Sequence, residues 1–98
     1  AIENGNFQVT EVYTTDGLNR KANLKVLEDD RNFFPEYNGA YLLRADLYED
    51  FPELEAIFQE LAGKFDNEIC TDLNYRIDVK VEEPKKVARE FLEEHNMR

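Results

Sequence analysis

Residues 12–18 read VYTTDGL, and this stretch sets the first expectation for the fold. The β-branched and aromatic residues at positions 12–15 favour an extended backbone, and the Asp16-Gly17 pair that follows is typical of a turn. We therefore expect a strand over 7–14 that ends in a turn or a single helical turn over 18–22. A second aromatic stretch, FFPEYNGAY at 33–41, again places a tyrosine, Tyr37, in an extended segment with polar neighbours.

The rest of the pattern predicts further strands and then helices. Segments 24–28 and 37–44 have the composition of strands, and 75–81 is expected to be extended as well. The expected helix signals are N-terminal caps at Asp46 and Asp66, first-turn prolines at Pro52 and Pro84, and a stop at Gly63. Strands combined with helices predict an α/β fold in which helices cover a mixed sheet.

The length and composition of the chain exclude several classes of function. The 98 residues suffice for one small domain, and the formal net charge of −10 argues against nucleic-acid binding, which needs a basic surface. No apolar run approaches the roughly 20 residues that span a bilayer, and no secretion leader is recognisable. One cysteine, Cys70, and one histidine, His95, argue against a metal site or a nucleophilic centre. We therefore predict no cofactor, no catalytic residues and no enzyme activity.

Five stretches taken together resemble a known family. In this order they are similar to the C-terminal part of the substrate-binding component of ABC importers for osmoprotectants such as glycine betaine, carnitine and choline. The resemblance covers essentially the whole chain, and the Tyr-x-Thr-Asp-Gly, LKVLEDD and FFP-x-Tyr runs are fairly specific in combination. The stretches are NGNFQVTEVYTTDGL (4–18), LKVLEDDRNFFPEY (24–37), PELEAIFQELAGK (52–64), DLNYRIDV (72–79) and EEPKKVAREFLEEH (82–95).

The resemblance implies a fold and a division of the chain. The family has a two-lobed periplasmic-binding-protein fold of type II, whose lobes close over the ligand. On that mapping the chain is the C-terminal segment of a solute-binding domain. Residues 1 to about 36 would end the second lobe, and residues from about 37 to 98 would return into the first lobe.

The resemblance also implies site residues. Tyr13 and Tyr37 match family positions that form walls of an aromatic cage around a trimethylammonium group. Such a cation has no N–H to donate, so aromatic faces suit it through apolar contact and cation–π attraction. Thr15 would add a polar contact, although turn chemistry also explains it, and spacing alone leaves both tyrosines as ordinary strand aromatics. The family commonly has proline at the position of Glu36 and Ala-Ala-Pro-like residues at 38–41, so this chain departs from the family pattern on both sides of Tyr37.

The implied function is binding of quaternary ammonium osmoprotectants and their delivery to the permease subunit of an ABC importer. The protein would act at the extracytoplasmic face of the cell membrane, lipid-anchored or fused to the permease, with the signal or anchor outside this chain. The alternative is an acidic protein-interaction module without small-molecule binding. The family's cage draws on residues from both lobes, much of it outside this chain, so we expect the chain alone to bind solute weakly or not at all. Because the expected strands lack evident partners, we also expect the chain to self-associate or to swap elements between copies.

Overall fold

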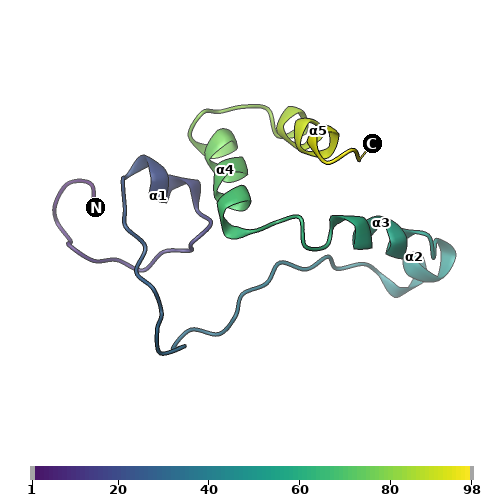
Figure 1. Cartoon of the computed structure of the whole chain (residues 1–98), viewed down its shortest axis with the longest axis horizontal. Helices are drawn as coiled ribbons and strands as arrows, with labels where there is room; N and C mark the ends of the chain where they lie inside the picture. The colour runs from purple at the N-terminus through teal and green to yellow at the C-terminus, as the bar shows by residue number, and fades with distance from the viewer. Residues whose placement is uncertain (1, 98) are drawn as a thin grey trace. The chain divides into compact units, whose positions relative to one another are not determined.

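The computed structural model describes residues 2–97, and these divide into two compact units. The first unit comprises residues 2–26 and 66–97, and the second comprises Leu27–Phe65. Helices α1, α4 and α5 belong to the first unit, and α2 and α3 belong to the second (Figure 1). Their bounds are Gly17–Lys21 for α1, Ala45–Asp50 for α2, Leu54–Leu61 for α3, Asn67–Asp78 for α4 and Pro84–Glu94 for α5.

The expected α/β fold with a mixed sheet is wrong for this chain. Residues 2–97 form helices and irregular segments, with no strand among them (Figure 1). A strand persists when its backbone N–H and C=O groups bond to a neighbouring strand, and a single extended segment cannot supply that ladder. The segments expected as strands at 7–14, 24–28 and 37–44 accordingly lie as irregular chain. The expected lobe division near residue 36 stays a prediction.

The fourth expected extended segment, 75–81, is wrong for a different reason. Helix α4 continues through most of it and ends at Asp78. The side chain of Asp66 caps this helix by accepting a hydrogen bond from the Ile69 amide at 2.8 Å. Once a helix has nucleated, each added residue gains one backbone bond, so propagation overrides the strand preference of single residues such as Tyr75 and Ile77.

Most of the expected helix boundaries are confirmed, but Pro52 precedes Glu53, the capping residue of α3, and so lies outside the first turn of that helix. Asp16 caps α1 and Asp66 caps α4, Pro84 is the first residue of α5, and Gly63 follows the end of α3 with a φ of 75°. A positive φ at this position is the usual end of a helix and favours glycine. The expected cap at Asp46 is wrong, because the capping position of α2 is occupied by Arg44 and no side chain caps it.

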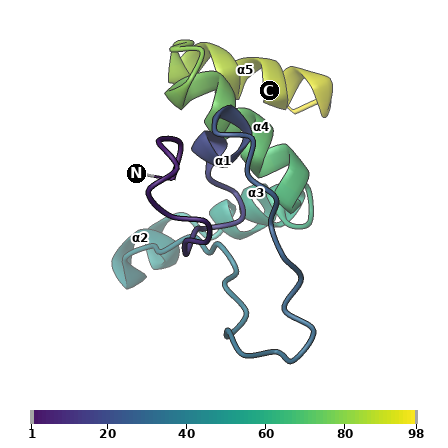
Figure 2. The same cartoon turned by 90° about the vertical axis from the view of Figure 1, so that its left-hand side faces the viewer.

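The first unit is held together by α4, which contacts both α1 and α5 (Figure 2). Its buried apolar residues are Val87 and Phe91 of α5, which are 1% and 7% exposed. Arg76 near the end of α4 pairs with Glu82 at 2.8 Å and with Glu90 of α5. These ion pairs fix the connection between the two helices on one side of the small core.

The second unit contains α2 and α3, and each of its residues, 27–65, is at least partly exposed. The rings of Tyr41 and Phe58 pack with their centroids 4.5 Å apart. The hydroxyl of Tyr48 in α2 donates to the Glu55 carboxylate in α3 at 2.6 Å, and this bond raises the pKa of Tyr48. Local side-chain contacts of this kind, rather than a buried core, hold α2 against α3.

Candidate ligand-binding site

Tyr13 lies in the irregular segment that leads into α1. Its side chain is 72% exposed, so the ring is not part of the packed interior of the first unit. Its backbone carbonyl accepts two hydrogen bonds, from the Asn19 side-chain amide at 2.7 Å and from the Asp16 amide at 3.2 Å. The Asp16 carboxylate in turn accepts from the Leu18 amide at 2.9 Å. The Tyr13 backbone is therefore fixed to the start of α1 while its ring remains exposed.

Thr15, the expected polar contact, is half-buried against α4. Its carbonyl accepts a hydrogen bond from the side-chain amide of Asn74 at 2.8 Å. Gly17 approaches the same helix so closely that an added Cβ would lie 2.5 Å from the Tyr75 backbone nitrogen. The Asp16-Gly17 pair that the sequence marked as a turn therefore also lets the start of α1 lie directly on α4.

Tyr37 lies in the second unit and is 80% exposed. The segment before it is ordered by Asp29, whose carboxylate accepts the amides of Phe33 at 3.0 Å and Phe34 at 2.9 Å. These two amides hold the pKa of Asp29 below its usual value, the Phe34 amide having the larger effect. The rings of Phe33 and Phe34 pack edge to face with centroids 5.0 Å apart. Because Tyr13 and Tyr37 belong to different units, their sharing of one cage stays a prediction.

Tyr75 lies on α4 where the backbone of Gly17 approaches that helix, and its ring is contacted by two cationic side chains. The guanidinium carbon of Arg20 lies 5.3 Å from the ring centroid, and the Lys80 ammonium lies 5.7 Å from it. Both distances fall within the range of a cation–π contact. Arg20 is held there by an ion pair with Asp72 at 2.8 Å. Tyr75 is therefore a packing residue of the α1–α4 contact, in contrast to the exposed Tyr13.

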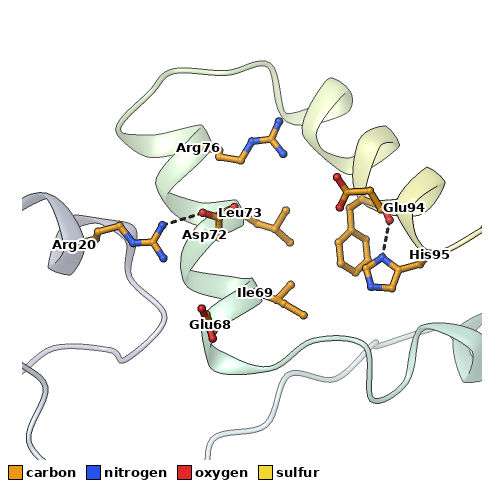
Figure 3. Close-up of a pocket in the computed structure, with 9 residues that line it drawn as sticks. Arg20, Glu68, Ile69, Asp72, Leu73, Arg76, Glu94 and His95 are labelled. Atoms are coloured by element: carbon orange, nitrogen blue, oxygen red, sulfur yellow. Dashed lines mark hydrogen bonds and ion pairs between the residues drawn. The ribbon is translucent and has the colours of Figure 1, made fainter.

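A cleft of about 320 Å³ lies on the side of α4 that faces α5 (Figure 3). Ile69 and Leu73 point into it from α4, and the arginines at its edges are each paired with a carboxylate. Sequence reasoning missed this cleft, although the spacing of Ile69 and Leu73 places both on one face of the helix. It is lined by Arg20, Glu68, Ile69, Asp72, Leu73, Arg76, Phe91, Glu94 and His95.

Neither a metal site nor a membrane-spanning helix is found among the described residues. Over residues 2–97 no group of three or more His, Cys, Asp or Glu side chains is placed to hold a metal ion. Within the same residues, none of the helices combines the length and apolar character needed to cross a membrane.

Comparison with known proteins identifies the class. Residues 1–94 match the model of the OpuAC family, the substrate binding domain of the ABC-type glycine betaine transport system. The chain thus belongs to a class of substrate-binding domains that serve transport and are not enzymes, as the sequence predicted. Within that class it is a member of the OpuAC family.

Individual relatives are similar over nearly the whole chain. The carnitine transport binding protein OpuCC of Listeria monocytogenes is 40% identical over 98% of this chain, and the glycine-betaine-binding protein of Pseudomonas aeruginosa is 36% identical over 99%. The ergothioneine transport permease/ergothioneine binding protein EgtU of Helicobacter pylori is 37% identical over 95%. The chain spans 31% of the length of the first two and 17% of the third.

Proposed function

We propose that this chain contributes to a binding site for quaternary ammonium osmoprotectants, with Tyr13 and Tyr37 as walls of an aromatic cage and Thr15 as a polar contact. The segment is the C-terminal part of a solute-binding domain that works at the extracytoplasmic face of the cell membrane. The domain delivers its solute to the permease of an ABC importer. It is either lipid-anchored or fused to that permease.

The ligand class is supported by what the relatives' solutes have in common. Glycine betaine, carnitine and ergothioneine each combine a trimethylammonium group with a carboxylate. The trimethylammonium group has no N–H, so a protein recognises it through aromatic faces and methyl contacts. A site that selects this shared group accepts glycine betaine, carnitine and choline, which differ at the other end of the molecule.

The observation that carries the proposal is the exposure of Tyr13 on a fixed backbone, within a chain that belongs to this family. A ring that is 72% exposed has most of its surface open to a ligand, while the bonds to Asn19 and Asp16 restrict the backbone beneath it. A contact between an aromatic ring and a cation contributes about 0.5–2 kcal/mol, more when water is excluded. One ring is therefore a weak binder, and several rings are required for useful affinity.

The proposal is tested on the binding protein that carries this segment, by titration calorimetry with glycine betaine, carnitine and choline. Tyr13→Leu and Tyr37→Leu remove the ring but keep an apolar side chain, and each is expected to weaken binding about 2- to 30-fold. Tyr13→Phe and Tyr37→Phe keep the ring and serve as matched controls that retain most of the affinity. Tyr48→Leu is a further control: it removes a half-exposed tyrosine that is hydrogen-bonded to Glu55 and is not proposed to touch the ligand, so it shows how much affinity is lost by removing a tyrosine elsewhere in the chain.

Two results would refute the proposal. If the wild-type protein binds none of the three solutes, the acidic protein-interaction module becomes the better interpretation. If the leucine variants at 13 and 37 bind as tightly as wild type, the solute is held by other residues.

The chain by itself is proposed to bind these solutes weakly. Two rings at the upper estimate give about 4 kcal/mol, which corresponds to a dissociation constant of about 1 mM. It is also proposed to self-associate or swap segments between copies, because apolar side chains such as Leu42, 99% exposed, and Phe33 remain on its surface. Size-exclusion chromatography with light scattering measures the second point, and a monodisperse monomer contradicts it.

A further inference from the structure

Two backbone carbonyls of the 13–15 segment, those of Tyr13 and Thr15, are held by side-chain amides from α1 and α4. The Tyr13 carbonyl accepts from Asn19, and the Thr15 carbonyl accepts from Asn74. The Thr71 hydroxyl lies 3.3 Å from the Thr14 carbonyl oxygen. Backbone carbonyls in an irregular segment usually bond to water, so this row of protein donors distinguishes the segment from an ordinary surface loop.

The two asparagines are the main donors in this row. A threonine hydroxyl has one proton, and that of Thr71 lies closer to the Asn67 carbonyl, at 2.6 Å, than to the Thr14 carbonyl. The side-chain amides of Asn19 and Asn74 donate at 2.7 and 2.8 Å. Asn19 is 6% exposed, and a buried amide that lost its acceptor would leave polar atoms unsatisfied. The bond from Asn74 joins residues 59 positions apart in sequence, so it attaches the segment to α4.

The segment has a second constraint at its other end. Gly17 lies against the backbone of residues 74 and 75, where an added Cβ would be 2.8 Å from the Asn74 carbonyl carbon. The bonded carbonyls and this close approach hold the backbone from Tyr13 to Gly17 at both ends. The exposed ring of Tyr13 is thus attached to a backbone that these contacts restrain.

We propose that Asn74, together with Asn19, is a positioning residue for ligand binding: it fixes the 13–15 backbone and thereby the direction of the Tyr13 ring. This inference rests on the proposed function, because it assigns a role to the support of a cage ring. A ring on a loose segment has to be ordered when the ligand binds, and that ordering lowers affinity. Loss of the Asn74 donor is expected to weaken binding about 2- to 10-fold without removing any ligand contact.

The test uses Asn74→Asp in the binding protein that carries this segment, with glycine betaine as the ligand. Aspartate has the same shape, but its ionised carboxylate cannot donate to the Thr15 carbonyl. Asn67→Asp, at an exposed position on the same helix, is the matched control. Affinity is measured by calorimetry at pH 7 and near pH 4, and amide hydrogen exchange of Asp16 and Leu18 is measured without ligand.

We expect three results for Asn74→Asp: weaker binding at pH 7, faster exchange of the two amides, and partial recovery of affinity near pH 4, where the introduced carboxyl begins to carry a proton that it can donate. Wild type and Asn67→Asp are titrated at both pH values, which shows how much of the change in affinity comes from the protonation of other groups. Unchanged affinity with faster exchange overturns the positioning role and leaves the proposed function intact. Lower affinity with unchanged exchange overturns it as well.

Failure of wild type to bind glycine betaine refutes the proposed function and this inference together. If Asn74→Asp loses its helical circular-dichroism signal, Asn74→Ala, which removes the donor without adding charge, replaces it in the same measurements. If both variants lose the helical signal, Asn74 is required for folding and the positioning assignment is overturned.

Discussion

The sharpest prediction from the packing concerns Gly17→Ala. Gly17 has no left-handed φ, so the reason for glycine here is space. A Cβ would lie 2.5 Å from the Tyr75 nitrogen and 2.6 Å from the Tyr75 Cα, whereas ordinary contact begins at 3.4 Å. These are backbone atoms that cannot rotate away, so α1 and α4 have to separate by most of an ångström. The Asn74–Thr15 bond, now 2.8 Å, would then exceed hydrogen-bonding distance.

The size of the effect follows from three contributions. Overpacking destabilises by about 1–3 kcal/mol, and loss of one hydrogen bond by about 0.5–1.5 kcal/mol. The better helix propensity of alanine offsets up to about 1 kcal/mol. The net expectation is a destabilisation of about 0.5–4.5 kcal/mol. Each kcal/mol lowers the melting temperature by roughly 4–8 °C in a chain of this size.

The assay is thermal unfolding followed by far-ultraviolet circular dichroism, with Gly39→Ala as the matched control. A Cβ added at Gly39 would have no atom within 4 Å, and Gly39 has no left-handed φ, so alanine there is expected to be neutral or to stabilise by about 0.4–1 kcal/mol. The reasoning is refuted if Gly17→Ala melts at the same temperature as Gly39→Ala.

Three further predictions concern local interactions. Asp29→Asn replaces the charged carboxylate that accepts hydrogen bonds from two backbone amides with a neutral, weaker acceptor. Hydrogen exchange of the Phe33 and Phe34 amides should therefore become severalfold faster, and unchanged exchange would show that the carboxylate does not order the segment. Val81→Gly should raise the melting temperature by relieving a φ of 57° in an exposed β-branched residue, a gain of about 0.5–1 kcal/mol after the entropy of glycine is subtracted; a lower melting temperature would contradict it. Arg76 lowers the pKa values of Glu82 and Glu90, so its ion pairs stabilise fully above the ordinary glutamate pKa of 4.5 and lose their effect as pH falls below it. Arg76→Gln should therefore flatten the acid side of the stability–pH curve, and an unchanged acid side would refute the assignment.

Local signals in the sequence predicted the helix boundaries well. Asp16, Asp66 and Pro84 act at the first turns of their helices, where a side-chain oxygen or a missing N–H is favourable whatever the rest of the chain does. Val87 and Phe91, the buried apolar residues of the first unit, stand four positions apart in the last helix, which is the spacing of one helix face. Such features depend on residues within one or two turns, so they can be read from a short stretch.

The strands were mispredicted because strand formation depends on partners. Residues 7–14 have a favourable composition, yet composition supplies no neighbouring ladder, and the segment lies as irregular chain. At 75–81 the cap on Asp66 and the continuing bonds of α4 outweighed the aromatic and β-branched residues. Asp46 was expected as a cap, but α2 begins one residue before it.

In the candidate site, too, the features that depend on distant parts of the chain could not be predicted from local sequence. Tyr13 and Tyr37 could be singled out only through the family resemblance, because their spacing also fits ordinary strand aromatics. The support of the Tyr13 segment by Asn74 could not be predicted, because it depends on how α1 packs against α4. An asparagine in the middle of a helix gives no signal of a distant acceptor.

The most direct test of the central claim is a crystal structure of the binding protein that carries this segment, with glycine betaine bound. We predict that the ring centroids of Tyr13 and Tyr37 both lie within about 6 Å of the quaternary nitrogen. A structure in which either ring faces away from the solute would contradict the proposed cage.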